Sequence, residues 1–209
     1  MNNGAGSTLR EQLGVSAEPD FEIDLPPGWE RRDVSDDDRA SLEAALRKKF
    51  LSVQRPDLHA AVHALVDGSY SAMTSAGAVA YYAATTGDEH TLWIPGSIVV
   101  STRTATPEIS MDQMVAHAIR EFEAKPLLGD KRFIRFERDE TVTVGESSIG
   151  LTTVEYLTPI PTTRRRRALQ FTATVARPVD AAVDDEQVVA SKHLYDACIS
   201  TLRWVAKSP

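Results

Sequence analysis

Hydrophobic and polar residues alternate in the segment FEIDLPPGWE, residues 21–30, and this pattern predicts the first strand of the fold. Phe21, Ile23 and Leu25 are separated by acidic residues, which is the period-two signature of a half-buried strand. Two prolines then end the strand, because proline cannot donate a backbone hydrogen bond to a neighbouring strand. We expect Trp29, which follows the turn, to fill an apolar gap in the core.

Four later segments have the three- and four-residue spacing of amphipathic helices. Ser35 precedes three aspartates and predicts a helix start, because serine caps free N–H groups and negative charge suits the N-terminal end of the helix dipole. Pro56 ends this helix, and Asp57 begins a second one that ends near Gly68 or a few residues beyond. A third helix follows Ser110, and a fourth occupies residues 184–204.

Five more segments predict strands, and short turns join most neighbours. They are residues 78–85, 98–101 within 91–104, 132–144, 149–160 and 167–179. Strands joined by short turns pair antiparallel, and the helices fall both before and after the hairpins. The sequence therefore predicts an α+β fold, an α/β/α sandwich around a mainly antiparallel central sheet of about six strands.

Length and charge limit the classes of protein to which the chain can belong. Its 209 residues suit one domain, which we expect over residues 20–207 after a flexible polar tail at residues 1–19. A formal net charge of −7 repels nucleic acid and anionic membranes, so we predict no nucleic-acid partner. No apolar run is long enough for a membrane span or a signal peptide, and we expect a cytoplasmic location.

Three local signals accompany the order of the elements. They are the entry FEIDLPPGW, the strand PGSIVV that runs into the helix SMDQMVAHAI, and the terminal helix ending LYDACISTLRW. Together they resemble the PsbP/Mog-type fold, and most closely its actinobacterial LpqN-like branch. The closing positions of that family are matched here by Tyr195, Ile199, Ser200 and Leu202.

The resemblance implies a non-catalytic role. Members of this fold are accessory or binding proteins: a Ran-GTPase partner, an extrinsic subunit of photosystem II and secreted bacterial lipoproteins. It therefore implies an accessory or protein-binding domain, with an envelope or secretion system as the suggested setting. The chain departs from the lipoprotein pattern, because no lipobox cysteine lies near its start. The resemblance supplies no catalytic residue.

A run of four arginines is the sharpest charge feature, made of Arg164, Arg165, Arg166 and Arg167. Such a run can hold a phosphate or an acidic partner segment through paired hydrogen bonds. It can equally form a solvated hairpin tip and the start of a strand, where arginines discourage edge pairing. Successive strand residues point to opposite faces, so at most two of the four can meet one ligand.

Other candidate chemistry is weaker. His59, His63 and Asp67 follow one helical face and could hold a metal, but they also suit an exposed helix surface. The acidic groups at residues 36–38, 139–140 and 184–186 could act as acid and base, although helix starts and a strand bend explain them. Cys198 is the only cysteine and lies on the apolar stripe of the last helix, which predicts a buried thiol.

The aromatic residues leave two functional classes open. Tyr81, Tyr82 and Trp93 could line a small-molecule pocket together with His117, or they could belong to the sheet core and edge. Our prediction is a non-catalytic domain without cofactor or metal that binds a protein partner through residues 164–167 and Trp93. A carrier or enzyme with a pocket between sheet and helix, and a protein that self-associates through a sheet edge, remain the alternatives.

Overall fold

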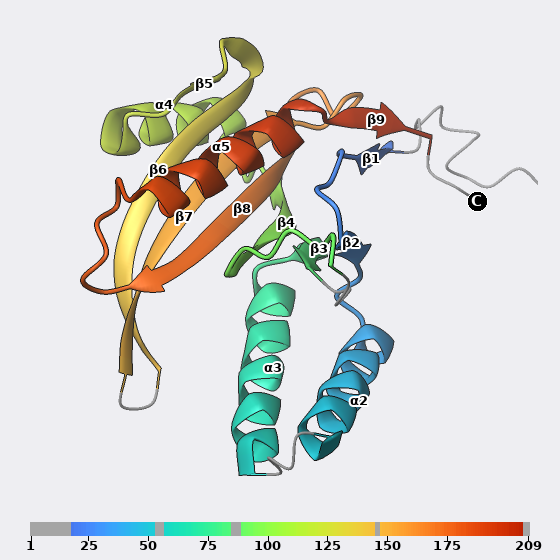
Figure 1. Cartoon of the computed structure of the whole chain (residues 1–209). Coiled ribbons are helices and arrows are strands. Elements are labelled where there is room, and N and C mark those ends of the chain that lie inside the picture. Colours follow the sequence, from blue (N-terminus) through green and yellow to red (C-terminus); the bar gives the residue numbers. More distant parts are fainter. Residues whose placement is uncertain (1–17, 53–56, 85–88, 145–146, 207–209) are drawn as a thin grey trace, which may run out of the picture.

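The computed structural model describes residues 18–52, 57–84, 89–144 and 147–206, and all structural statements below refer to these (Figure 1). They form an α+β fold with four helices and a large antiparallel sheet, as the sequence predicts. None of the described helices is both long enough and apolar enough to span a bilayer.

The main sheet has seven strands, where the sequence pattern predicts about six. In spatial order they are β2 (Trp29–Arg32), β3 (Ala78–Ala84), β4 (Gly96–Thr104), β8 (Arg167–Pro178), β7 (Ser147–Pro159), β6 (Asp130–Val144) and β5 (Lys125–Leu127). Every neighbouring pair is antiparallel. The five longer strands are those that the alternation predicts, and β2 and β5 are too short to show a period of two.

The first predicted strand lies outside this sheet. It shortens to β1 (Asp20–Glu22), which pairs antiparallel with β9 (Arg203–Val205) near the other end of the chain. Phe21 and Ile23 are nevertheless buried in the main core. Trp29 is also buried, and its indole N–H donates to the carbonyl oxygen of Leu92 at 2.8 Å. The prediction that Trp29 packs in the core is therefore confirmed.

The helix α5 (Glu186–Ser200) covers one face of the main sheet. Apolar side chains of alternate strand positions face it, among them Val100, Val154, Phe171 and Val175. Tyr195 and Ile199 complete this core from the helix, and the predicted burial of Cys198 is confirmed. Burial raises the pKa of the Cys198 thiol, which keeps it protonated and unreactive.

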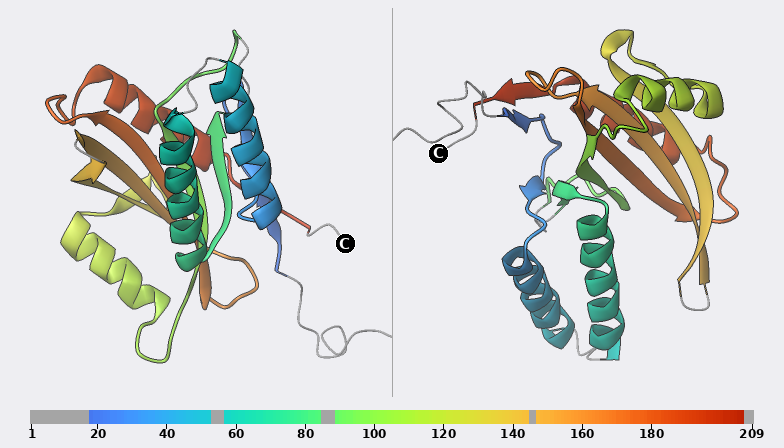
Figure 2. Two further views of the ribbon diagram at one scale, coloured as in Figure 1. Left: turned by 90° about the horizontal axis from the view of Figure 1, so that it is seen from below. Right: turned by 180° about the vertical axis from the view of Figure 1, so that it is seen from behind.

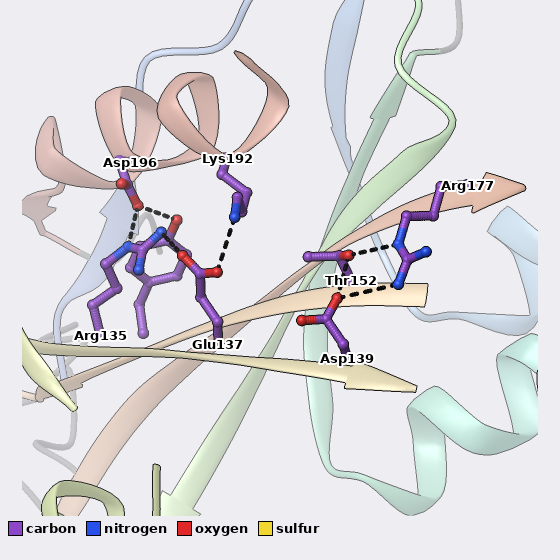
Figure 3. A network of polar contacts seen from close by, with 8 residues as sticks. Arg135, Glu137, Asp139, Thr152, Arg177, Lys192 and Asp196 are labelled. Carbon is purple, nitrogen blue, oxygen red and sulfur yellow. Dashed lines mark hydrogen bonds and ion pairs between the residues drawn. The ribbon is translucent and has the colours of Figure 1, made fainter. Parts of the chain in front are cut away.

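A network of charged groups fastens α5 to the sheet (Figure 3). Asp196 accepts hydrogen bonds from Arg135 Nε at 2.7 Å and from the Tyr156 hydroxyl at 2.6 Å. Lys192 donates to Glu137 at 3.0 Å. Burial alone would raise the pKa of Glu137, but hydrogen bonds from Arg135 and Lys192 outweigh it and lower the pKa. These contacts fix the position of α5 along β6 and β7.

The same face carries a second polar group farther along the strands (Figure 3). Thr152 on β7 donates to Asp139 on β6 at 2.5 Å and accepts from Arg177 Nε on β8 at 3.2 Å. Arg177 Nη2 also lies 3.7 Å from Asp139. The contacts of Asp139 therefore help to link the three strands β6, β7 and β8.

The helix α4 (Met111–Phe122) contacts the opposite face. Leu157 lies beside Met111 of α4, whereas the preceding Tyr156 faces α5, and successive strand residues point to opposite faces. Phe122 stacks on Phe136 of β6 with a centroid distance of 5.1 Å. The predicted cap is confirmed, because Ser110 and Gln113 form a reciprocal capping box.

The helices α2 (Asp36–Ser52) and α3 (Asp57–Ser75) form a hairpin that extends away from the sheet (Figure 2). We call this hairpin the arm. Asp38 lies at its base, within hydrogen-bond distance of the hydroxyls of Tyr70 and Tyr81 at 2.5 and 3.0 Å. Arg32 completes the junction with an ion pair of 2.7 Å to Asp38. One polar cluster therefore connects both helices to strands β2 and β3.

Candidate functional site

The arginine run lies on the connection between β7 and β8, residues 160–166. The Thr163 hydroxyl donates to the carbonyl oxygen of Ile160 at 2.7 Å and closes the turn. Thr162, Arg164 and Arg165 all have left-handed backbone angles, with φ of 69°, 51° and 59°. That conformation is unfavourable for residues other than glycine, so the turn is held by its hydrogen bonds.

An apolar cavity of about 150 Å³ lies beside this turn, between α4 and the sheet. Its apolar walls come from four elements: Met111 and Val115 of α4, Ile134 of β6, Leu157 and Pro159 of β7, and Ala168 of β8. The rim is polar and mostly cationic, with Lys131, Arg132 and Arg165 against the single acid Asp112. The site therefore combines an apolar floor with a basic rim.

A second hollow, of about 430 Å³, adjoins the first on the far side of the turn. Arg132, Arg165 and Pro159 line both, and Arg164 and Trp204 contribute to the second. We call the four cationic side chains Lys131, Arg132, Arg164 and Arg165 the basic surface. It surrounds the cavity on the side of the β7–β8 turn.

Two arginines of the basic surface, Arg164 and Arg165, are at most loosely neutralised within the described residues. Arg165 lies 3.5 Å from Asp112, and its side chain is 75% exposed, so this ion pair is weak and easily exchanged. Arg132, by contrast, holds Asp130 through three side-chain hydrogen bonds and one from its backbone N–H, and these lower the pKa of that carboxyl group. Within the described residues Arg164 forms no ion pair. An incoming acidic group can therefore reach at least two guanidinium groups.

The structure divides the predicted arginines between neighbouring hollows. Arg164 and Arg165 line the hollows just described, whereas Arg167 begins β8 and pairs with Glu18 beside another hollow. Arg166 is exposed and lines neither of the two hollows at the turn. Residues 164–166 lie in a turn and not in a strand, so the alternation argument does not apply to them, although Arg164 and Arg165 do line one hollow together.

Trp93 is not near the arginine run. Its side chain is 61% exposed, and it precedes Gly96 at the start of β4, whereas Arg167 pairs with Thr104 at the end of that strand. A nine-residue strand spans roughly 27 Å. The two predicted contact points therefore cannot act on one small ligand.

Lys131 and Arg132 were missed by sequence reasoning, although strand register could have found them. Ile134 pairs with Leu157, so Arg132 lies two positions away toward the turn that carries Arg165. The separation of more than thirty residues along the chain hides this proximity. Only the pairing of β6 with β7 brings the two basic segments together.

The aromatic and histidine candidates do not form one pocket. Tyr82 is buried in the core, and Tyr81 belongs to the polar cluster at the base of the arm. His117 is exposed on α4, with its ring edge against Phe122 at a centroid distance of 5.8 Å. The alternative in which Tyr81, Tyr82 and His117 converge on a ligand is therefore not supported, whereas the expected place of Tyr82 in the sheet core is confirmed.

The proposed metal ligands are only partly brought together. His63 and Asp67 gather with Glu43, their ligand atoms lying within 4.8 Å of one another. The guanidinium of Arg39 lies 3.3 Å from Asp67, so a cation already balances this group. The side chain of His59 is outside the described part of the structure.

A scan against protein-family models and a search of curated proteins found no match to this chain. The interpretation of the site therefore depends on its geometry.

Proposed function

We propose that this protein is a non-catalytic binding domain that holds an acidic segment of another protein at the basic surface. The observation that carries the proposal is the apolar cavity between α4 and the sheet, rimmed by Lys131, Arg132 and Arg165. An acidic segment with one large apolar side chain matches both the apolar cavity and its basic rim. The apolar side chain enters the cavity, and flanking carboxylates meet the guanidinium groups.

The size of the cavity favours an anchoring side chain over an enclosed molecule. Its volume of about 150 Å³ is below the ~300 Å³ at which pockets for small molecules begin. Burying one Leu or Phe side chain contributes about 1.5–3 kcal/mol. For the apolar cavity itself, this supports an anchoring side chain more than an enclosed small molecule.

Charge supports the choice of an acidic partner. The protein as a whole carries a net charge of −7, so a basic surface on it is a local exception. Such a surface attracts an acidic segment locally, while the remaining surface repels an acidic partner elsewhere and thus restricts its orientation. We predict that binding weakens with added salt.

The fold family, the cellular role and the location of the protein are also proposals. A PsbP/Mog-type sandwich is the fold we propose, and contacts of α4 and α5 with opposite sheet faces support it. An accessory role beside an envelope or secretion system follows from the resemblance alone. The cytoplasmic location likewise stays a prediction.

The test uses three fluorescent peptides that share a central Phe, flanked by Glu, Ser or Lys. Fluorescence anisotropy of each with the whole protein should show binding of the Glu peptide, weaker binding of the Ser peptide and none of the Lys peptide. Arg165→Ser should weaken the Glu peptide about five- to tenfold, because one charge-assisted contact of about 1 kcal/mol or more is lost.

Arg166→Ser is the matched control, because Arg166 lies on the same turn and lines neither hollow. This variant should bind the Glu peptide as the unchanged protein does. Equal affinity for all three peptides, or equal losses in the two variants, would overturn the proposal.

A further inference from the structure

In its described part the arm has little apolar core of its own. Among the α2 residues whose burial is described, none is fully buried, and in the described part of α3 only Tyr70 at the base is buried. Leu51 and Leu65, farther along the arm, are 59% and 53% exposed. Because so little of the described part of the arm is buried, a further packing partner would stabilise it.

A hollow runs along α2 and reaches α3 at His63. It is lined by Ala40, Glu43, Ala44, Arg47, Lys48 and Leu51, with His63 from α3. The α2 residues are spaced three and four apart and therefore form one stripe along the helix. Ala40 and Ala44 are the small residues of this stripe, which lets another helix approach closely.

The charge along α2 changes sign from one end to the other. Asp36, Asp37 and Asp38 occupy the first turn, whereas Arg47 and Lys48 lie in the second half. Two copies of such a helix attract one another when they run antiparallel, because each acidic end then meets a basic end. A uniformly acidic or basic partner helix would meet like charge over half of the stripe.

We propose that this stripe of α2 is a self-association surface, on which a second copy of this chain packs its own α2 antiparallel. With the two-fold axis at Ala44, Ala40 lies opposite Lys48 of the second copy. Asp37 then lies three residues from that lysine, about 4.5 Å along the helix, within reach of its long side chain. The same contacts form twice, as a two-fold interface requires.

This surface is separate from the basic surface. It belongs to the arm, whereas the basic surface lies on β6 and the β7–β8 turn. Self-association through α2 also differs from the sheet-edge pairing that the sequence suggests. Either proposal can therefore fail without the other.

Sedimentation velocity over a range of concentrations tests the surface. The unchanged protein should shift from monomer to dimer as concentration rises, and Ala44→Arg should stay monomeric because two arginines meet at the axis. Ala45→Arg is the matched control, since Ala45 is exposed on the same helix and does not line the hollow. It should dimerise as the unchanged protein does.

A charge exchange distinguishes loss of the dimer contact from unfolding of the arm. Lys48→Glu should weaken the dimer, and adding Asp37→Lys should restore it, while circular dichroism confirms that helix content is kept. A monomer at all soluble concentrations overturns the proposal, as does failure of the double variant to recover.

Disulfide trapping checks the geometry directly. Ala44→Cys should give a covalent dimer on oxidation, because its two copies meet at the axis, whereas Ala45→Cys should not. The native Cys198 is buried and does not interfere. If the protein dimerises but Ala44→Cys forms no covalent dimer, the dimer uses another interface. This outcome also overturns the proposal.

Discussion

Two buried tyrosines on the same sheet face differ in what their hydroxyl groups meet. The Tyr156 hydroxyl donates to Asp196 at 2.6 Å. The Tyr82 hydroxyl is fully buried and has no hydrogen-bond partner among the described residues. Burial raises the pKa of Tyr82 to about 12, so its proton stays on the oxygen. An unpaired buried hydroxyl costs about 1–3 kcal/mol.

Removing the Tyr156 hydroxyl and removing the Tyr82 hydroxyl should therefore change the free energy of unfolding differently. Tyr156→Phe should lower the free energy of unfolding by about 1–3 kcal/mol, because Asp196 loses a donor. Tyr82→Phe should leave it unchanged or raise it by about 1 kcal/mol, because only an unpaired group is removed. Urea unfolding of both variants measures the difference, and equal losses would mean that the Tyr82 hydroxyl has a partner after all.

At the scale of elements, the close contact of β4, β8 and α5 depends on one glycine. A Cβ atom at Gly96 would lie 1.8 Å from the carbonyl oxygen of Thr174 on β8 and 2.7 Å from the hydroxyl of Tyr195 on α5. That hydroxyl itself donates to the Thr174 carbonyl at 2.9 Å. No side chain fits at this crossing without moving backbone.

Gly96→Ala should lower the free energy of unfolding by more than about 3 kcal/mol or prevent folding. Gly68→Ala is the matched control, because Gly68 lies inside α3 with nothing within 4 Å of the added Cβ. There the change should raise stability by about 1 kcal/mol, since alanine favours helix. Thermal unfolding followed by circular dichroism separates the two, and similar melting temperatures would contradict the crowding at Gly96.

At the scale of the whole molecule, the arm is joined to the sheet through Asp38. Burial alone would raise the pKa of Asp38, but hydrogen bonds from Arg32, Tyr70 and Tyr81 outweigh it and lower the pKa below its ordinary 3.8. The folded state therefore binds this proton less readily than the unfolded state. Asp38 stabilises the fold above about pH 4, and this contribution is lost as the pH falls through the lower, folded-state pKa.

Asp38→Asn should lower the free energy of unfolding at neutral pH by about 1–3 kcal/mol, because Arg32 loses its charged partner. It should also flatten the loss of stability between about pH 5 and pH 3. Asp36→Asn serves as control, since that side chain is 97% exposed and its nearest cation is 4.0 Å away. Urea unfolding at several pH values tests this, and parallel pH profiles for the two variants would rule out the role of Asp38.

The parts of the fold that sequence could predict are those with local signals. Ser110 caps α4 as expected, and the long strands β6, β7 and β8 follow their alternation. The short strands β2, β5 and β9 escaped prediction, because three or four residues show no periodicity and their pairing is long-range.

The candidate site divides in the same way. Arg164 and Arg165 were visible as part of a charge run, whereas the cavity beside them needs α4, β6 and β7 to be in place. Trp93 is conspicuous in the sequence, yet the length of β4 separates it from the arginines. Composition can show which side chains are available, and the register of the strands determines which of them meet.

The pairing of β1 with β9 has a practical consequence for protein engineering. Asp20 lies directly opposite Val205, so the two flanks of the domain leave the fold at adjacent points, about 5 Å apart. A host protein with a surface loop could therefore carry residues 20–205 as an insertion without its own chain being pulled apart. Joining the two flanks by a short linker would likewise close the domain into a ring with little strain.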